Sequence, residues 1–103
     1  MLDKSAVRQI AKSYASEVKK ELNPKEVILF GSYVNGSPHE WSDIDIAVVM
    51  DGFTGDWLKT ASLLFSLRRG VSIDIEPHLM DVQHDQSGFL EHIKKTGEII
   101  YAA

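Results

Sequence analysis

Hydrophobic positions in the first part of the chain recur at steps of three and four residues, the period of an amphipathic helix. Residues 3–22 are therefore predicted to form a helix. Its apolar face consists of Val7, Ile10, Ala11, Tyr14, Ala15, Val18 and Leu22. Asn23 and Pro24 follow, and the residue before a proline is pushed out of helical geometry. The helix is expected to end there.

The next apolar positions form runs that are too short for helices. Residues 27–30 are continuously apolar, which favours a strand buried on both faces. Residues 43–50 alternate at first, with Asp43 and Asp45 separated by an isoleucine, and then become apolar. They are predicted to form a second strand that is polar at its start and buried further along.

Helical patterns return in two later segments, with a third strand between them. Residues 56–69 and 87–96 combine apolar positions with cationic residues and a glycine at the C-terminal end, so both are predicted to be helices. Residues 71–76 alternate and predict a strand, which Pro77 ends or places at a sheet edge. Residues 99–101 are interpreted as a last half-turn or an edge strand. The order predicts a short central sheet with helices packed against it.

Composition narrows the class of protein without identifying it. The 103 residues favour one domain, residues 1–103, and the absence of cysteine excludes a disulfide framework and a thiolate zinc site. No signal peptide and no apolar run of membrane-spanning length is visible, so we expect a cytoplasmic protein without a membrane partner. The net charge of −4 argues against nucleic acid as a partner.

Paired carboxylates are the first candidate chemistry. Side chains at i and i+2 of a strand share a face, so Asp43 and Asp45 should project together. Oxygen ligands of this kind suit Mg²⁺. The third strand offers Asp74 and Glu76 at the same spacing, and the four carboxylates would converge if the two strands were neighbours. That layout is typical of a two-metal site for phosphoryl or nucleotidyl transfer.

The turn before the second strand adds a candidate phosphate site. Gly31 and Ser32 follow a buried strand, where a glycine allows the backbone to approach a ligand closely. Backbone amides and the Ser32 hydroxyl could then hold a phosphate. The four histidines lack zinc-like spacing and are interpreted as surface residues, although His78, just past the third strand, could lie near the site.

These motifs together resemble a known family. LFGSYVNGS at residues 29–37 and SDIDIAV at residues 42–48 are similar to the motif of the minimal nucleotidyltransferases of the DNA polymerase β-like superfamily. The resemblance covers nearly the whole chain. It implies an α/β (α+β) fold, with a small mixed β-sheet flanked by helices. One departure is Tyr33, where many relatives carry arginine.

The resemblance also implies an activity and roles. Relatives transfer AMP from ATP to an acceptor hydroxyl. Gly31 and Ser32 would hold the triphosphate, and Asp43 and Asp45 would bind Mg²⁺. The third carboxylate, between hydrophobic residues, would be Asp74, with Glu76 in reserve. It would complete the second of two metal sites.

The resemblance further implies a partner. A chain this short is similar to the stand-alone form that is paired with a helical HEPN toxin, which the transferase adenylylates as an antitoxin. The residues Trp57, Leu63, Phe65 and Leu67 wrap around more than one face of their helix, which indicates either an interface or a helix sandwiched inside the domain. Two alternatives stay open, a module that only neutralises or scaffolds a helical partner, and an antibiotic-modifying transferase. A homo-oligomer also stays open.

Overall fold

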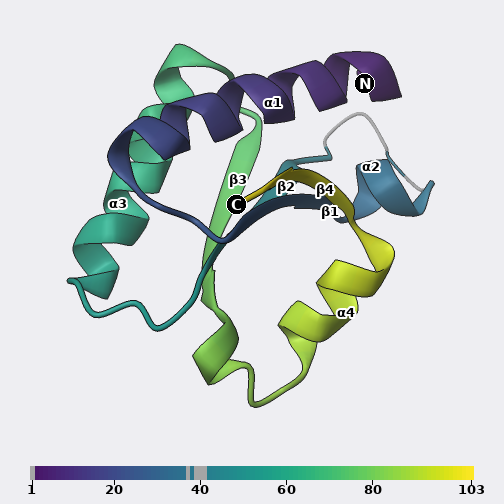
Figure 1. The fold of residues 1–103 in the computed structure, drawn as a ribbon. Coiled ribbons are helices and arrows are strands. Elements are labelled where there is room, and N and C mark those ends of the chain that lie inside the picture. The colour runs from purple at the N-terminus through teal and green to yellow at the C-terminus, as the bar shows by residue number, and fades with distance from the viewer. Residues whose placement is uncertain (1, 37, 39–41) are drawn as a thin grey trace.

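A four-stranded sheet forms the centre of the computed structural model, which describes residues 2–36, 38 and 42–103 (Figure 1). The strands are β1 (Glu26–Phe30), β2 (Ile44–Met50), β3 (Ile75–Asp81) and β4 (Glu98–Ala102), in the order β3-β2-β1-β4. β1 is antiparallel to both β2 and β4, whereas β2 and β3 are parallel. The predicted small mixed sheet is confirmed, and the apolar tail is an edge strand.

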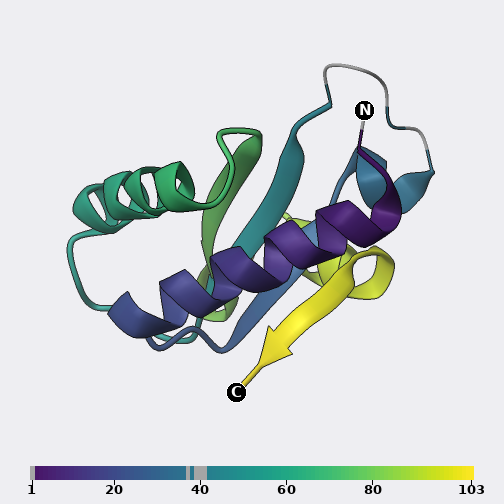
Figure 2. The same ribbon diagram turned by 90° about the horizontal axis from the view of Figure 1, so that it is seen from above.

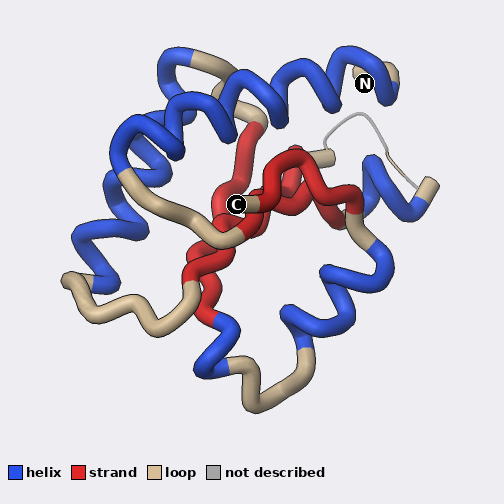
Figure 3. Tube along the Cα trace, viewed as in Figure 1, coloured by secondary structure: helices blue, strands red, loops and turns tan. Residues whose placement is uncertain are grey.

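Helices cover both faces of this sheet, as Figures 2 and 3 show. α1 (Lys4–Glu21) and α3 (Trp57–Leu67) pack on one face, and α4 (Phe89–Thr96) packs on the other. The alternation of the strands produces these two cores, because successive side chains point to opposite faces. In β2, Ile44, Ile46 and Val48 face α1 and α3, while Ala47 and Val49 face α4.

α1 confirms the helix that was predicted for residues 3–22. Asp3 caps it by accepting a hydrogen bond from the backbone N–H of Ala6 at 2.7 Å. The predicted apolar face is buried at five of its positions, Val7, Ala11, Tyr14, Ala15 and Val18. The hydroxyl of Tyr14 donates to the carbonyl of Leu64 at 2.6 Å and so ties α1 to α3.

The prediction that a strand spans residues 71–76 was wrong at both ends. After α3 the chain continues as a 3₁₀ turn, η1 (Arg68–Gly70), and the N–H of Ser72 donates to the carbonyl of Arg68 at 2.8 Å. The guanidinium of Arg68 also donates to the carbonyls of Ile73 and Ile75. These bonds hold the segment before Ile75 in a turn. β3 starts there and runs through Pro77, which is tolerated because β3 lies at the sheet edge.

Two short elements complete the connections. α2 (Ser32–Asn35) forms a single helical turn directly after β1, and η2 (Val82–His84) follows β3. Asp81, at the end of β3, accepts hydrogen bonds from the N–H groups of Gly52, Phe53 and Gln83. Its carboxylate therefore fastens the loop after β2 to the end of β3. The depressed pKa of Asp81 is due to these bonds, with the one from Gln83 the largest contribution.

α3 is not sandwiched inside the domain. Only Leu64 of this helix is fully buried, and Leu63 and Leu67 are partly buried. Trp57, Leu58 and Phe65 remain exposed, Leu58 to 79%. The helix therefore buries one face and presents an apolar outer face to solvent. Within the described part of the chain, no helix is both long and apolar enough to cross a membrane.

Candidate active site

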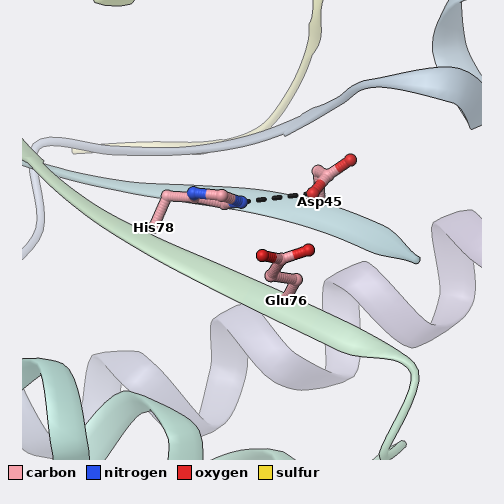
Figure 4. A group of neighbouring side chains, drawn as sticks. All are labelled: Asp45, Glu76 and His78. Atoms are coloured by element: carbon pink, nitrogen blue, oxygen red, sulfur yellow. Dashed lines mark hydrogen bonds and ion pairs between the residues drawn. The ribbon is translucent and has the colours of Figure 1, made fainter.

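Three side chains from the neighbouring parallel strands β2 and β3 gather on the face of the sheet that carries α4. Asp45 of β2 lies opposite Glu76 of β3, and His78 follows two residues along β3 on the same face. Among the described residues, one donor atom from each of these three side chains lies within 4.8 Å of the other two. Figure 4 shows them pointing toward one another. All three are partly exposed, so a ligand can reach them.

His78 is held by two neighbours. Its Nε2 lies 3.1 Å from Oδ1 of Asp45, and its ring makes an edge-type contact with the ring of Phe30, with ring centroids 5.1 Å apart. Phe30 in turn contacts Phe89 of α4 at a centroid distance of 6.1 Å. The aromatic rings of Phe30 and Phe89 therefore extend from His78 toward α4.

Asp43 is a neighbour of Glu76. It lies two residues before Asp45, just ahead of β2, and is exposed. A hydrogen bond between the carboxyl groups of Asp43 and Glu76 raises the pKa of Glu76 above its usual value, because such a bond needs a proton on one of the two. Burial and the negative charges of both aspartates act in the same direction, while His78 opposes them. Carboxylates this close fit a site that receives a cation.

Gly31 lies directly against Asp45. It has φ +86° and ψ −155°, a conformation that residues with a side chain rarely adopt. A β-carbon on Gly31 would collide with Oδ2 of Asp45 and lie 3.1 Å from its Cγ. The backbone of the turn at Gly31 is therefore in close contact with the carboxylate of Asp45. Ser32 follows as the first residue of α2, so the two residues proposed to hold phosphate lie next to the proposed metal ligands.

Asp74 lies outside β3, in the turn before it. Asp74 is exposed in the turn before β3, where its N–H donates to Oγ of Ser72 and its carbonyl accepts from the N–H of Ile44. Among the described residues, the set of donors that gather with Asp45 consists of Glu76 and His78 and includes neither Asp74 nor Asp43. The role of Asp74 as a metal ligand stays a prediction, and the geometry favours Glu76, which lies within the strand.

Sequence reasoning underrated two members of the group. His78 and Glu76 have the i, i+2 spacing of side chains that share a strand face, and this signal was available once the strand was known to continue past Pro77. Tyr33, the departure from the family motif, is buried at 5% exposure in the core with α1. His84 and His92 are exposed as expected, and His39 lies outside the described residues.

The donor set fits a divalent cation. Carboxylate oxygens are the usual protein ligands of Mg²⁺, and an imidazole nitrogen is a common ligand of transition metals. Repulsion between the carboxylates of Asp43, Asp45 and Glu76 would be relieved by a cation bound among them. The arrangement can therefore hold a metal ion beside a phosphate held at the Gly31 turn.

Comparison with known proteins agrees with this geometry. The family described as "Polymerase beta, Nucleotidyltransferase" matches residues 12–103. A curated protein of Methanocaldococcus jannaschii, named as a "putative protein adenylyltransferase", is 33% identical over 72 residues, which are 70% of this chain and 83% of that protein.

Solved structures share the fold. A "putative nucleotidyltransferase" from Sulfolobus solfataricus superposes with a TM-score of 0.70 at 23% identity, over 96% of this chain and 83% of that one. A toxin–antitoxin complex with AMP-PNP gives a TM-score of 0.68 at 23% identity, over 89% and 73%. A tri-AMPylated HEPN toxin of Shewanella oneidensis in complex with an MNT antitoxin gives 0.65 at 21% identity, over 93% and 73%. The chain belongs to the polymerase beta nucleotidyltransferase family, and it is a nucleotidyltransferase.

Proposed function

We propose that this nucleotidyltransferase is a Mg²⁺-dependent adenylyltransferase that moves AMP from ATP to a hydroxyl of a partner protein. The observation that carries the proposal is the meeting of Asp45 and Glu76 across β2 and β3, directly against the Gly31 turn. Carboxylates beside a backbone turn are the parts that nucleotidyl transfer needs, because the reaction depends on positioning and charge neutralisation.

The residues of this chain take the following roles. The backbone at Gly31 and the hydroxyl of Ser32 hold the triphosphate of ATP and orient its α-phosphorus. An oxygen of the acceptor hydroxyl attacks that phosphorus, and pyrophosphate leaves from the opposite side. A carboxylate of the group accepts the hydroxyl proton. The turn and the strands thus bring the two substrates into line.

Asp43, Asp45 and Glu76 would hold the metal. When bound, Mg²⁺ neutralises charge on the phosphates and activates the attacking oxygen. We assign the third carboxylate to Glu76 in place of Asp74, because Glu76 is paired with Asp45 in the sheet register and Asp74 lies in the preceding turn. We expect two ions, as in two-metal sites for nucleotidyl transfer, and metal titration of the purified protein would count them.

A helical HEPN-type toxin is the proposed acceptor, which makes this chain an antitoxin. The support is twofold. Structural neighbours with the same fold include toxin–antitoxin complexes, one of them with an AMPylated HEPN toxin. In addition, the outer face of α3 exposes Leu58 and Phe65, and Ile73 in the turn before β3 is 75% exposed. An exposed apolar surface of this kind suits a protein acceptor better than a small antibiotic.

The experiment is a transfer assay with the purified protein, a HEPN-type partner encoded beside it, Mg²⁺ and α-labelled ATP. We expect label on the partner and none with the Asp43→Asn/Asp45→Asn variant. The matched control is Asp56→Asn, which changes an exposed aspartate at the start of α3. A native protein that binds and neutralises the partner without labelling it would overturn the proposal in favour of a binding module. Label on an aminoglycoside alone would favour antibiotic modification.

A further inference from the structure

We propose that His78 supplies a nitrogen ligand to the metal site, so that the site binds Mn²⁺ more selectively over Mg²⁺ than carboxylates alone would. The inference rests on the proposed function, since it concerns the metal that serves the transfer. It concerns a residue of this chain outside the Asp-x-Asp motif and outside the pair Asp74 and Glu76.

The positions of the donor atoms carry the proposal. Nε2 of His78 and Oδ1 of Asp45 are 3.1 Å apart, and one donor atom from each of Asp45, Glu76 and His78 lies within 4.8 Å of the other two. Adjacent ligands in an octahedral site with bonds of about 2.1 Å are separated by about 3 Å, and opposite ligands by about 4 Å. The atoms of His78 and Asp45 are therefore spaced as adjacent ligands of one ion are, and Glu76 offers a third donor within 4.8 Å of the donor atoms of both.

The imidazole is also held in place. His78 lies within β3, opposite Ala47 of β2, and its ring makes an edge-type contact with the ring of Phe30. The side chain is 32% exposed, so part of it remains open to solvent. An ion bound here would replace the hydrogen bond between His78 and Asp45 with two metal bonds.

The chemistry of the ligands then sets the preference. Mg²⁺ favours oxygen ligands, whereas imidazole favours transition metals. A site with one nitrogen and two carboxylate ligands should still accept Mg²⁺, but it should bind Mn²⁺, which tolerates both ligand types, more tightly. Loss of the imidazole should reduce the affinity for Mn²⁺ more than the affinity for Mg²⁺.

The test is pulsed electron paramagnetic resonance on tag-free, metal-stripped protein loaded with Mn²⁺. We expect modulation from a directly bound ¹⁴N nucleus in the native protein and its loss in His78→Gln. Titration should show the affinity for Mn²⁺ reduced by about tenfold or more in that variant, with a smaller change for Mg²⁺. The matched control is His92→Gln, which alters an exposed histidine of α4 and should match the native protein.

The outcomes separate this inference from the proposed function. Native protein without ¹⁴N modulation, or an unchanged Mn²⁺ to Mg²⁺ affinity ratio in a folded His78→Gln variant, overturns the assignment of His78. Transfer of label with Mg²⁺ would leave the proposed function standing in that case. Conversely, ¹⁴N modulation without any transfer would support the metal site while overturning the function. Thermal melting of both variants verifies that they are folded.

Discussion

Gly31 and Asp45 are packed so closely that the glycine leaves no room for a β-carbon beside the carboxylate. Gly31→Ala should therefore displace Asp45 and also strain the backbone. We expect a loss of about 1–3 kcal/mol in the free energy of unfolding and a reduction in transfer rate on the order of 100-fold. Chemical denaturation and the labelling assay measure the two effects.

The control for this prediction is Gly36→Ala. Gly36 also has a positive φ, +80°, but nothing lies within 4 Å of the position of its β-carbon. It should lose about 1 kcal/mol of stability from backbone strain and keep its transfer rate. Equal rates in the two variants would contradict the role of the contact with Asp45.

The second prediction compares the two candidates for the third carboxylate. Glu76→Gln should lower the transfer rate on the order of 100-fold, because a carboxylate that lies opposite Asp45 is lost from the metal site. Asp74→Asn should keep most of the activity, because Asp74 is exposed in the turn before β3. Steady-state rates at saturating metal decide the assignment. A reversed order of the two effects would restore Asp74 as the ligand.

The third prediction concerns pH and Asp81. Its folded pKa lies below its usual value of 3.8, so its carboxylate stabilises the fold fully above that value. This stabilisation is lost as the pH falls through the folded pKa. Asp81→Asn should be less stable than the native protein at pH 7, and the difference should narrow in acid below about pH 3.8. Urea unfolding across pH measures this.

For Asp81 the matched control is Glu91→Gln, which changes an exposed carboxylate of α4. Its stability should follow the native protein closely at every pH. If the difference between Asp81→Asn and the native protein were constant down to the lowest pH, the charge of Asp81 would not be what fastens the loop.

The fourth prediction concerns the contact between α1 and α3. Tyr14→Phe removes the buried hydroxyl that donates to the carbonyl of Leu64, and should cost about 1 kcal/mol of stability. Burial also raises the pKa of this hydroxyl well above its usual range, so it stays protonated and able to donate at all ordinary pH values. Tyr101→Phe, at a partly exposed ring, serves as the control and should change little.

The sequence predicted the helices and the Asp-x-Asp strand because those depend on local periodicity. The face of α1 follows directly from the three- and four-residue steps between Val7 and Val18, and the burial of those positions confirms it. The pair Asp43 and Asp45 was recognisable for the same reason, because the side chains of residues i and i+2 in a strand point to the same face of the sheet.

The start of β3 could not be predicted in this way. Alternation from Val71 to Glu76 is equally compatible with a strand that starts at either end of that segment. The outcome depends on Arg68, whose guanidinium binds the carbonyls of Ile73 and Ile75 and holds the preceding chain in a turn. Asp74 and Glu76 are two residues apart and would lie on the same face of a strand. The alternating pattern therefore does not distinguish them as ligands, and only the contacts of Arg68 leave Asp74 in the turn and Glu76 in the strand.

The parallel pairing of β2 and β3 has a consequence for how the enzyme becomes active. Asp45 and Glu76 lie opposite each other only after the whole connection through α3 has closed, a contact between residues far apart in the sequence. Such contacts carry a loop-closure cost and tend to slow folding. A chain that has formed α1 and the antiparallel pair of β1 and β2 would already bury much of its core and yet have no complete site. Catalytic competence in this protein should therefore arise at the end of folding.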